Sequence, residues 1–298
     1  MKNLIITISL LFATAAALYA QDTRTLIHED GGLGPYKAVI VSDASLSTHT
    51  IFKPQDLSTF NKDNPLPVLV WGNGACRNTP YEHVNFLNEI ASHGFIVIAI
   101  GPMPENFDSL IENGGSDSEL LTYAIDWIIA QNENPQSQYY NKIDVWNIAA
   151  GGMSCGGLQT LDVAKDPRLS TVMICNSGLF KVSNASSAVP GMPMPTKDRL
   201  AEIHTPIIYI LGGESDIAYE NGMDDFSQIN HVPIFAANLN VGHGGTYAQP
   251  HGGAFSTVAT AWLKWQLKGD AKAGQLFKGS PCGLLSIDGW RADKKNIP

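Results

Sequence analysis

The chain has 298 residues, of which 28 are acidic and 19 are Lys or Arg, so its formal net charge is −9. This acidic balance argues against nucleic acid or an anionic membrane as the partner, because both favour basic protein surfaces. The composition suits a neutral or uncharged small-molecule or polymeric ligand.

The first twenty residues have the pattern of a secretory signal peptide. Lys2 supplies a positive charge, residues 4–18 form an apolar run that is short for a membrane span, and Ala17 to Ala20 offer a small-residue cleavage site. The alternative is an uncleaved membrane anchor. We expect residues 1–20 to be removed, residues 21–298 to form a single domain, and the protein to be secreted or periplasmic.

The rest of the chain alternates short apolar runs with helix-like stretches. Buried parallel strands are predicted at 37–41, 67–71, 95–100, 145–150, 171–175, 206–211 and 233–239. Helices are predicted at 82–92, 118–131, 157–164 and 253–267. This alternation predicts the α/β class, with a doubly wound, mostly parallel sheet and helices on both faces.

One stretch breaks this alternation. Residues 179–197 are rich in Ser, Ala, Pro, Met and Gly, and they follow a predicted strand. Long loops in compact domains are usually functional or disordered, and ligands bind at the carboxyl ends of strands in open α/β sheets. We therefore expect a wall or lid of a substrate cleft, in which Phe180 and Met192 contact the ligand. A surface excursion is the alternative.

The segment from Gly152 to Gly156 has the G-x-S-x-G pattern of a nucleophile elbow. A predicted strand leads into it and a predicted helix leaves it, which is the context that the pattern requires. A sharp turn there would expose Ser154, and the glycines would leave room for it. A structural turn is the alternative. Met153 and Gly74 would lie beside this serine and contact the substrate.

A catalytic serine needs a base and an acid, and both have candidates at the ends of later strands. Asp216 is favoured over Glu214 as the acid, because Glu214 lies closer to the end of its strand. His243 lies between glycines directly after the next strand, whereas His251 begins the last predicted helix. The chain order of serine, acid and histidine is that of the α/β-hydrolase triad.

Two backbone N–H groups are expected to form an oxyanion hole. One is that of Cys155, and the other is that of Asn73 in the glycine-rich turn after residues 67–71, with Gly74 as the alternative. A plain tight turn would also account for these glycines. Neither the cysteines nor the eight histidines show metal-ligand spacing, so no metal or cofactor is expected.

The four cysteines allow two interpretations, because spacing alone does not give a pairing. Cys155 follows the candidate nucleophile and Cys76 lies just beyond the glycine-rich turn, which makes Cys76–Cys155 the first expected disulfide. Alternatively, Cys155 and Cys175 are buried free thiols. Cys282 has no assigned partner.

Five segments together resemble the branch of the α/β hydrolases that contains dienelactone hydrolases, chlorophyllases and bacterial cutinases or polyesterases. They are Ala91 to Ile100, Trp71 to Asn73, Gly152 to Gly156, Gly213 to Asp216, and Gly242-His243. The resemblance implies a cofactor-independent serine ester hydrolase with Ser154, Asp216 and His243 at the triad positions.

The chain departs from the bacterial polyesterases of that branch. These carry Trp or His before the serine, Met or Gln after it, and an aromatic residue in the oxyanion loop, where this chain has Met153, Cys155 and Asn73. The departures favour ester hydrolysis in general over polyester turnover.

The sequence therefore predicts an exported, monomeric serine carboxylic-ester hydrolase that works through an acyl-enzyme. Feruloyl or acetyl esters of plant polysaccharide are the expected substrates, with a cutinase-like polyesterase or a short-chain carboxylesterase as the alternative. A serine peptidase and a non-catalytic binding protein on the same fold are further alternatives.

Overall fold

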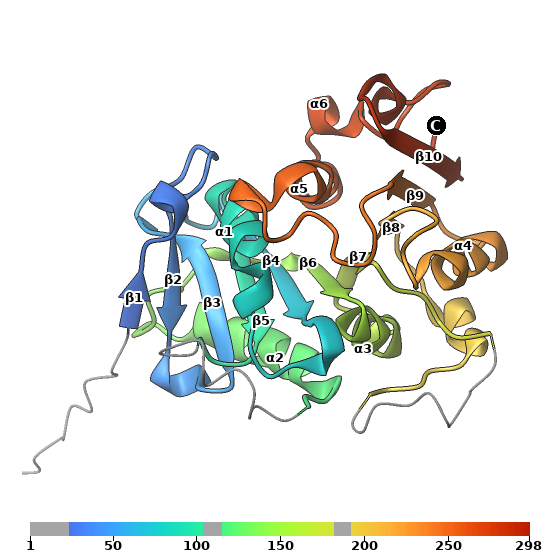
Figure 1. Ribbon diagram of the computed structural model, residues 1–298. Coiled ribbons are helices and arrows are strands. Elements are labelled where there is room, and N and C mark those ends of the chain that lie inside the picture. The colour runs from blue at the N-terminus through green and yellow to red at the C-terminus, as the bar shows by residue number, and fades with distance from the viewer. Residues whose placement is uncertain (1–23, 104–114, 182–191) are drawn as a thin grey trace, which may run out of the picture.

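A computed structural model describes residues 24–103, 115–181 and 192–298. The predicted signal peptide and the centre of the 179–197 loop lie outside the described residues. Within them, ten strands form one sheet in the order β1-β2-β3-β5-β4-β6-β7-β8-β9-β10 (Figure 1).

The middle of this sheet is parallel and both of its margins are antiparallel. The parallel strands are β4 (Leu66–Gly72), β5 (Ile96–Ile100), β6 (Ile143–Met153), β7 (Leu169–Cys175), β8 (Ile207–Leu211) and β9 (Ile234–Leu239). The antiparallel strands are β1 (Arg24–Leu26), β2 (Ala38–Ser42) and β3 (His49–Pro54) beside β5, and β10 (Trp290–Lys295) beside β9.

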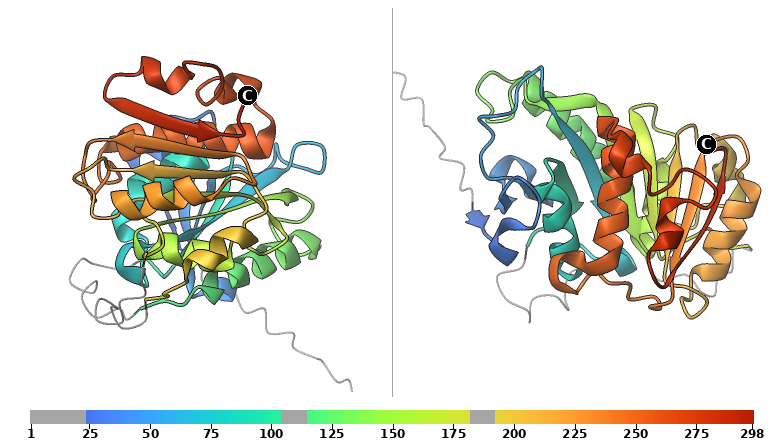
Figure 2. Two further views of the ribbon diagram at one scale, coloured as in Figure 1. Left: turned by 90° about the vertical axis from the view of Figure 1, so that its right-hand side faces the viewer. Right: turned by 90° about the horizontal axis from the view of Figure 1, so that it is seen from above.

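Helices cover both faces of the sheet (Figure 2). One layer contains α2 (Glu119–Glu133), α3 (Cys155–Val163) and α4 (Tyr219–Gln228). The other contains α1 (Val84–Ser92), α5 (Gly253–Lys268) and the short α6 (Ala271–Gly274).

The side chains of β4 show how the sequence builds these two layers. Val68 and Val70 pack in the core with α2 and α3, whereas Leu69 and Trp71 pack in the core with α1 and α5. All four are fully buried. Successive side chains of a strand point to opposite faces, so a continuous apolar run is what a strand covered on both sides requires.

The seven predicted strands and four predicted helices are present, with ends that shift by up to three residues. The prediction that residues 37–41 form a parallel strand is wrong, because β2 is antiparallel to both of its neighbours. After the last predicted helix the chain returns to the sheet as β10, a strand that is absent from the predictions. β10 reads Trp-Arg-Ala-Asp-Lys-Lys, and such polar strands are usual at a sheet edge.

The parallel register places the candidate functional loops at one edge of the sheet. Gly152 of β6 pairs with Gly72 of β4 and with Ile174 of β7, so the loops that follow these three strands start side by side. The loops after β8 and β9 open at the same edge. No helix in the described part of the chain is long and apolar enough to span a bilayer.

Candidate active site

Ser154 occupies the turn between β6 and α3 in a strained conformation, with φ 54° and ψ −116°. A Cβ on Gly152 would lie 2.2 Å from the carbonyl oxygen of Gly156, and a Cβ on Gly156 would lie 2.1 Å from that of Gly72. Only glycine fits at either position. These contacts give the physical reason for the G-x-S-x-G spacing and fix the direction of the serine side chain.

His243 lies between the serine and a carboxylate. Its Nε2 is 3.0 Å from Ser154 Oγ, and its Nδ1 is 2.6 Å from Asp216 Oδ1. Because an ionised carboxylate only accepts hydrogen bonds, Nδ1 carries the ring proton and Nε2 is left to accept the proton of the serine. The three residues therefore have the geometry of a nucleophile, a base and an orienting acid.

Asp216 is buried and fully hydrogen-bonded. Besides His243, its carboxylate accepts bonds from the backbone N–H groups of Gly212 (3.0 Å) and Ala218 (2.9 Å) and from Asn176 Nδ2 (2.7 Å). Burial alone would raise the pKa of Asp216, but these bonds, that with His243 first, hold the pKa below its usual range. The carboxylate thus stays ionised and faces the imidazole.

The competing candidates lie elsewhere. The side chain of Glu214 is 77% exposed and lies 3.6 Å from Arg291. His251 lies in a short 3₁₀ turn before α5, where its Nδ1 is 3.4 Å from Glu29 and 3.5 Å from Glu89. Neither of them contacts the serine.

The glycine-rich turn after β4 is linked covalently to the start of α3. A disulfide joins Cys76 to Cys155, with Cα atoms 5.1 Å apart. Ser116 donates to the carbonyl of Cys76 through both its N–H (2.9 Å) and its hydroxyl (3.0 Å), and Gln159 of α3 donates to Ser116. The first predicted disulfide is confirmed, and Cys175 and Cys282 are free and buried.

Asn73, the predicted oxyanion residue, is buried at the start of this turn. Its side-chain amide donates to the carbonyls of Ile100 (2.7 Å) and Arg77 (2.9 Å), which fixes the first residue of the loop against β5. Cys155 is the first residue of α3, so its N–H is among the unpaired amides at the positive end of that helix.

A cleft of about 90 Å³ opens beside Ser154 and His243, and its wall includes Phe180 and Met192. The side chain of Ile217, next to Asp216, is 80% exposed at its rim. Met153 instead lies in the apolar core, and a Cβ on Gly74 would lie 2.8 Å from its sulfur. Two of the four predicted substrate contacts thus line the cleft, while the other two pack against each other.

The part of the chain that contains these three residues is similar to known proteins. A family model described as PETase, PET hydrolase-like, matches residues 81–287, which include Ser154, Asp216 and His243. The chain belongs to this family. Cutinase est1 from Thermobifida alba is 27% identical over 210 residues, which are 68% of this chain and 62% of that protein. The PET hydrolase-like match begins after the turn that contains Asn73 and Cys76.

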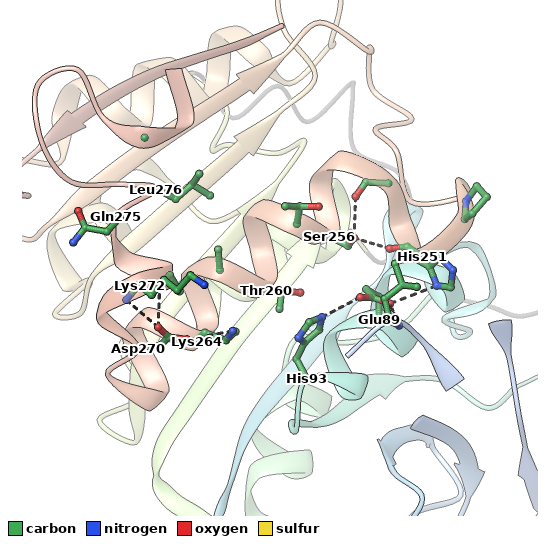
Figure 3. Close-up of a pocket in the computed structure, with 17 residues that line it drawn as sticks. Glu89, His93, His251, Ser256, Thr260, Lys264, Asp270, Lys272, Gln275 and Leu276 are labelled. Carbon is green, nitrogen blue, oxygen red and sulfur yellow. Dashed lines mark hydrogen bonds and ion pairs between the residues drawn. The ribbon is translucent and has the colours of Figure 1, made fainter. Parts of the chain in front are cut away.

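A second and larger cavity, of about 750 Å³, lies along α5 on the other helical layer (Figure 3). Glu89, His93 and His251 line one end of it, and Lys264, Asp270 and Lys272 line the other. His93 Nε2 bonds to Glu89 Oε1 at 3.0 Å, and Lys264 pairs with Asp270 at 3.2 Å. These groups pair with one another and not with a nucleophile.

Over residues 24–103, 115–181 and 192–298, no group of three or more His, Cys, Asp or Glu side chains could hold a metal ion.

Two residues that lie close to the candidate triad were not among the predicted site residues. Asn176 directly follows β7 with φ 44°, and Tyr247 lies four residues after His243. A polar residue at the carboxyl end of a central strand was the available signal for Asn176.

Proposed function

We propose that the protein is a serine carboxylic-ester hydrolase. The observation that carries this proposal is the continuous hydrogen-bonded series from Ser154 through His243 to Asp216. Membership of the PET hydrolase-like family and the similarity to a protein named a cutinase support the same reaction class. The chain spans 62% of the length of that cutinase, so the family evidence supports the site more strongly than any one substrate.

In the proposed mechanism Ser154 Oγ attacks the ester carbonyl while His243 Nε2 accepts the serine proton. Asp216 stabilises the imidazolium that forms, and the N–H groups of Asn73 and Cys155 bind the oxyanion. His243 then gives its proton to the leaving alcohol, and an acyl-serine remains. Water repeats the same steps to release the acid and restore the hydroxyl.

The substrates proposed first are esters with an apolar acyl or aromatic group. Phe180 and Met192 supply an apolar wall, and Ile217 and Val241 expose apolar side chains on the loops that carry the acid and the base. Feruloyl and acetyl esters of polysaccharide fit this description, and so do polyester chains. Family membership favours the polyester alternative.

A substrate panel tests the proposal. Purified protein should hydrolyse p-nitrophenyl acetate and butyrate, and Ser154→Ala should not. Feruloylated or acetylated oligosaccharides and a polyester film then separate the two substrate classes by the initial rate of acid release. Absence of wild-type hydrolysis on every ester would leave a peptidase or a binding protein as the better interpretation.

Export is part of the proposal. The apolar run near the amino terminus fits a signal peptide, and the Cys76–Cys155 disulfide is of the kind that persists outside the cytosol. Amino-terminal sequencing of the protein recovered from the medium or periplasm tests it. The expected first residue is Gln21.

A further inference from the structure

Asn176 lies directly behind the candidate triad and forms hydrogen bonds with Asp216 on one side and Tyr247 on the other. Its Nδ2 donates to Asp216 Oδ2 at 2.7 Å and lies 3.3 Å from the carbonyl of Gly242, the residue before His243. Its Oδ1 accepts from the hydroxyl of Tyr247 at 2.5 Å. All three side chains of this series are buried.

Tyr247 is held rigidly by its own packing. Its ring makes edge contacts with His83 (5.0 Å), Phe86 (5.2 Å) and Phe255 (5.5 Å between centroids). Gly245 has φ 55°, and a Cβ there would lie 2.6 Å from the Tyr247 ring. The turn that carries His243 is therefore folded against this tyrosine.

The direction of each hydrogen bond in this series follows from what its partners can donate or accept. Asp216 only accepts hydrogen bonds, so the amide must turn its Nδ2 toward the carboxylate and its Oδ1 toward Tyr247. The tyrosine hydroxyl must then donate. An Asn176 side chain without this donor could rotate and place its oxygen against the carboxylate, where the two oxygens would repel each other.

We propose that Asn176 and Tyr247 are positioning residues that extend the triad into a series of five hydrogen-bonded side chains, holding Asp216 in line with His243. This inference rests on the proposed hydrolase function. Tyr247 acts on both the base and the acid of the triad. Its ring supports the turn that carries His243, and its hydroxyl orients the amide that holds Asp216.

The titratable groups that contact this series are His243, Cys175 and His83. Burial raises the pKa of the Cys175 thiol, and burial lowers the pKa of His83 to about 3, so both stay neutral near pH 7. Burial also raises the pKa of Tyr247 well above its usual range, which keeps the proton that it donates. The acid limb of the activity profile then reports the coupled Asp216–His243 pair.

The test compares three variants by kcat, KM and the pH profile of kcat/KM on a soluble p-nitrophenyl ester, with thermal melting as the folding check. Asn176→Gly removes the amide and tolerates the positive φ of this position. Tyr247→Phe removes only the hydroxyl. Tyr209→Phe is the matched control, because it removes a buried tyrosine hydroxyl that donates to Asp225, a carboxylate with no hydrogen bond to Ser154, His243 or Asp216.

Asn176→Gly should lower kcat by about 10-fold to 100-fold, the usual range for a lost hydrogen bond to a charged group, with KM nearly unchanged. Tyr247→Phe should lower kcat by about 3-fold to 10-fold. In both variants the acid limb should move to higher pH, because a carboxylate that loses a donor binds the proton and the imidazolium more strongly. Tyr209→Phe should lower Tm and leave the limb in place.

An acid limb that stays at its wild-type position in both Asn176→Gly and Tyr247→Phe overturns the inference, whatever happens to Tm. A limb that moves equally in the Tyr209→Phe control overturns it as well. Failure of the proposed function looks different, because the wild-type protein itself would then hydrolyse none of the esters.

Discussion

The cleft beside Ser154 and the cavity along α5 both contain histidine beside carboxylate, yet only in the cleft does the histidine ring also contact a serine hydroxyl. In the cleft, His243 contacts one buried carboxylate through Nδ1 and a strained serine through Nε2. In the cavity, His251 faces two carboxylates, Glu29 and Glu89, and no nucleophile. The cleft measures about 90 Å³ and the cavity about 750 Å³, so the candidate active site is not the larger of the two.

The difference lies in what the carboxylates hold in place. Asp216 orients an imidazole whose second nitrogen is directed at a hydroxyl. Glu89 instead accepts from the N–H of Leu33 (2.9 Å), and Glu29 accepts from the N–H of His251 (2.8 Å). These bonds attach the amino-terminal segment to α1 and to the turn before α5. The cavity groups therefore stabilise the fold, whereas the cleft groups carry the proposed reaction.

Loss of the nucleophile should have the largest effect. Ser154→Ala is expected to lower kcat by about 10⁴-fold or more, because the members of a triad act as a unit. Circular dichroism and Tm should match those of the wild type. Hydrolysis above a few per cent of the wild-type rate would place the nucleophile elsewhere.

The two histidines give the most direct contrast between the regions. His243→Ala should lower kcat by about 10³-fold to 10⁴-fold, whereas His251→Ala should leave kcat near the wild-type value and lower Tm. Parallel kinetics and melts of the two variants provide the measurement. A larger kcat loss in His251→Ala would transfer the role of the base to the cavity.

The disulfide should have an intermediate effect, because it supports the loop that carries the proposed oxyanion donor Asn73 without taking part in the reaction. Its 79-residue sequence separation predicts that Cys76→Ala/Cys155→Ala loses about 2–5 kcal/mol of unfolding free energy. We expect kcat to fall about tenfold with KM little changed, less than the 10²-fold to 10³-fold cost of losing an oxyanion donor. Cys282→Ala, which removes a buried free thiol, is the control. An unchanged kcat in the double variant would show that the loop keeps its position without the bond.

The smallest effect on activity is expected in the α5 cavity. Burial would raise the pKa of Glu89, but hydrogen bonds from His93 and the Leu33 N–H lower it below its usual range overall. A lowered carboxyl pKa stabilises the fold above the unfolded-state value of 4.5, and this stabilisation disappears as the pH falls through the folded-state pKa. Glu89→Gln should therefore lose about 1–3 kcal/mol of unfolding free energy at pH 7. The difference in unfolding free energy between the variant and the wild type should become smaller below about pH 4.5. Thermal melts of both proteins from pH 7 to pH 4 measure this difference in stability. A fall in the kcat of Glu89→Gln at pH 7 would contradict the assignment of the cavity groups to fold stability alone.

Local patterns in the sequence were sufficient to select the candidate-site residues that follow directly from a strand. Ser154, Asp216 and His243 each lie just beyond a central strand, and parallel pairing brings such positions to one edge. The oxyanion roles of Asn73 and Cys155 stay predictions. The choice between the two cysteine interpretations needed the fold, because only the distance between two loops decides it.

Other features depend on tertiary contacts that no local pattern contains. The helix α4 includes Asn221 and Gly222 and has low intrinsic helix propensity, yet Tyr219, Met223 and Phe226 pack it against the core. The edge strand β1 has only three residues and the edge strand β10 is polar, so neither contains the apolar run that predicts a buried strand. Asn176 and Tyr247 are 71 residues apart, and only the packing of the His243 turn brings their side chains together.

Covalent labelling of Ser154 tests the central claim most directly, because it detects an activated nucleophile without requiring the right substrate. Wild-type protein treated with a fluorophosphonate should gain one adduct per chain, and mass spectrometry of its peptides should locate that adduct on Ser154. His243→Ala should label far more slowly, and His251→Ala should label at the wild-type rate. A folded wild-type protein that stays unlabelled, or that carries its adduct on another residue, would contradict the account.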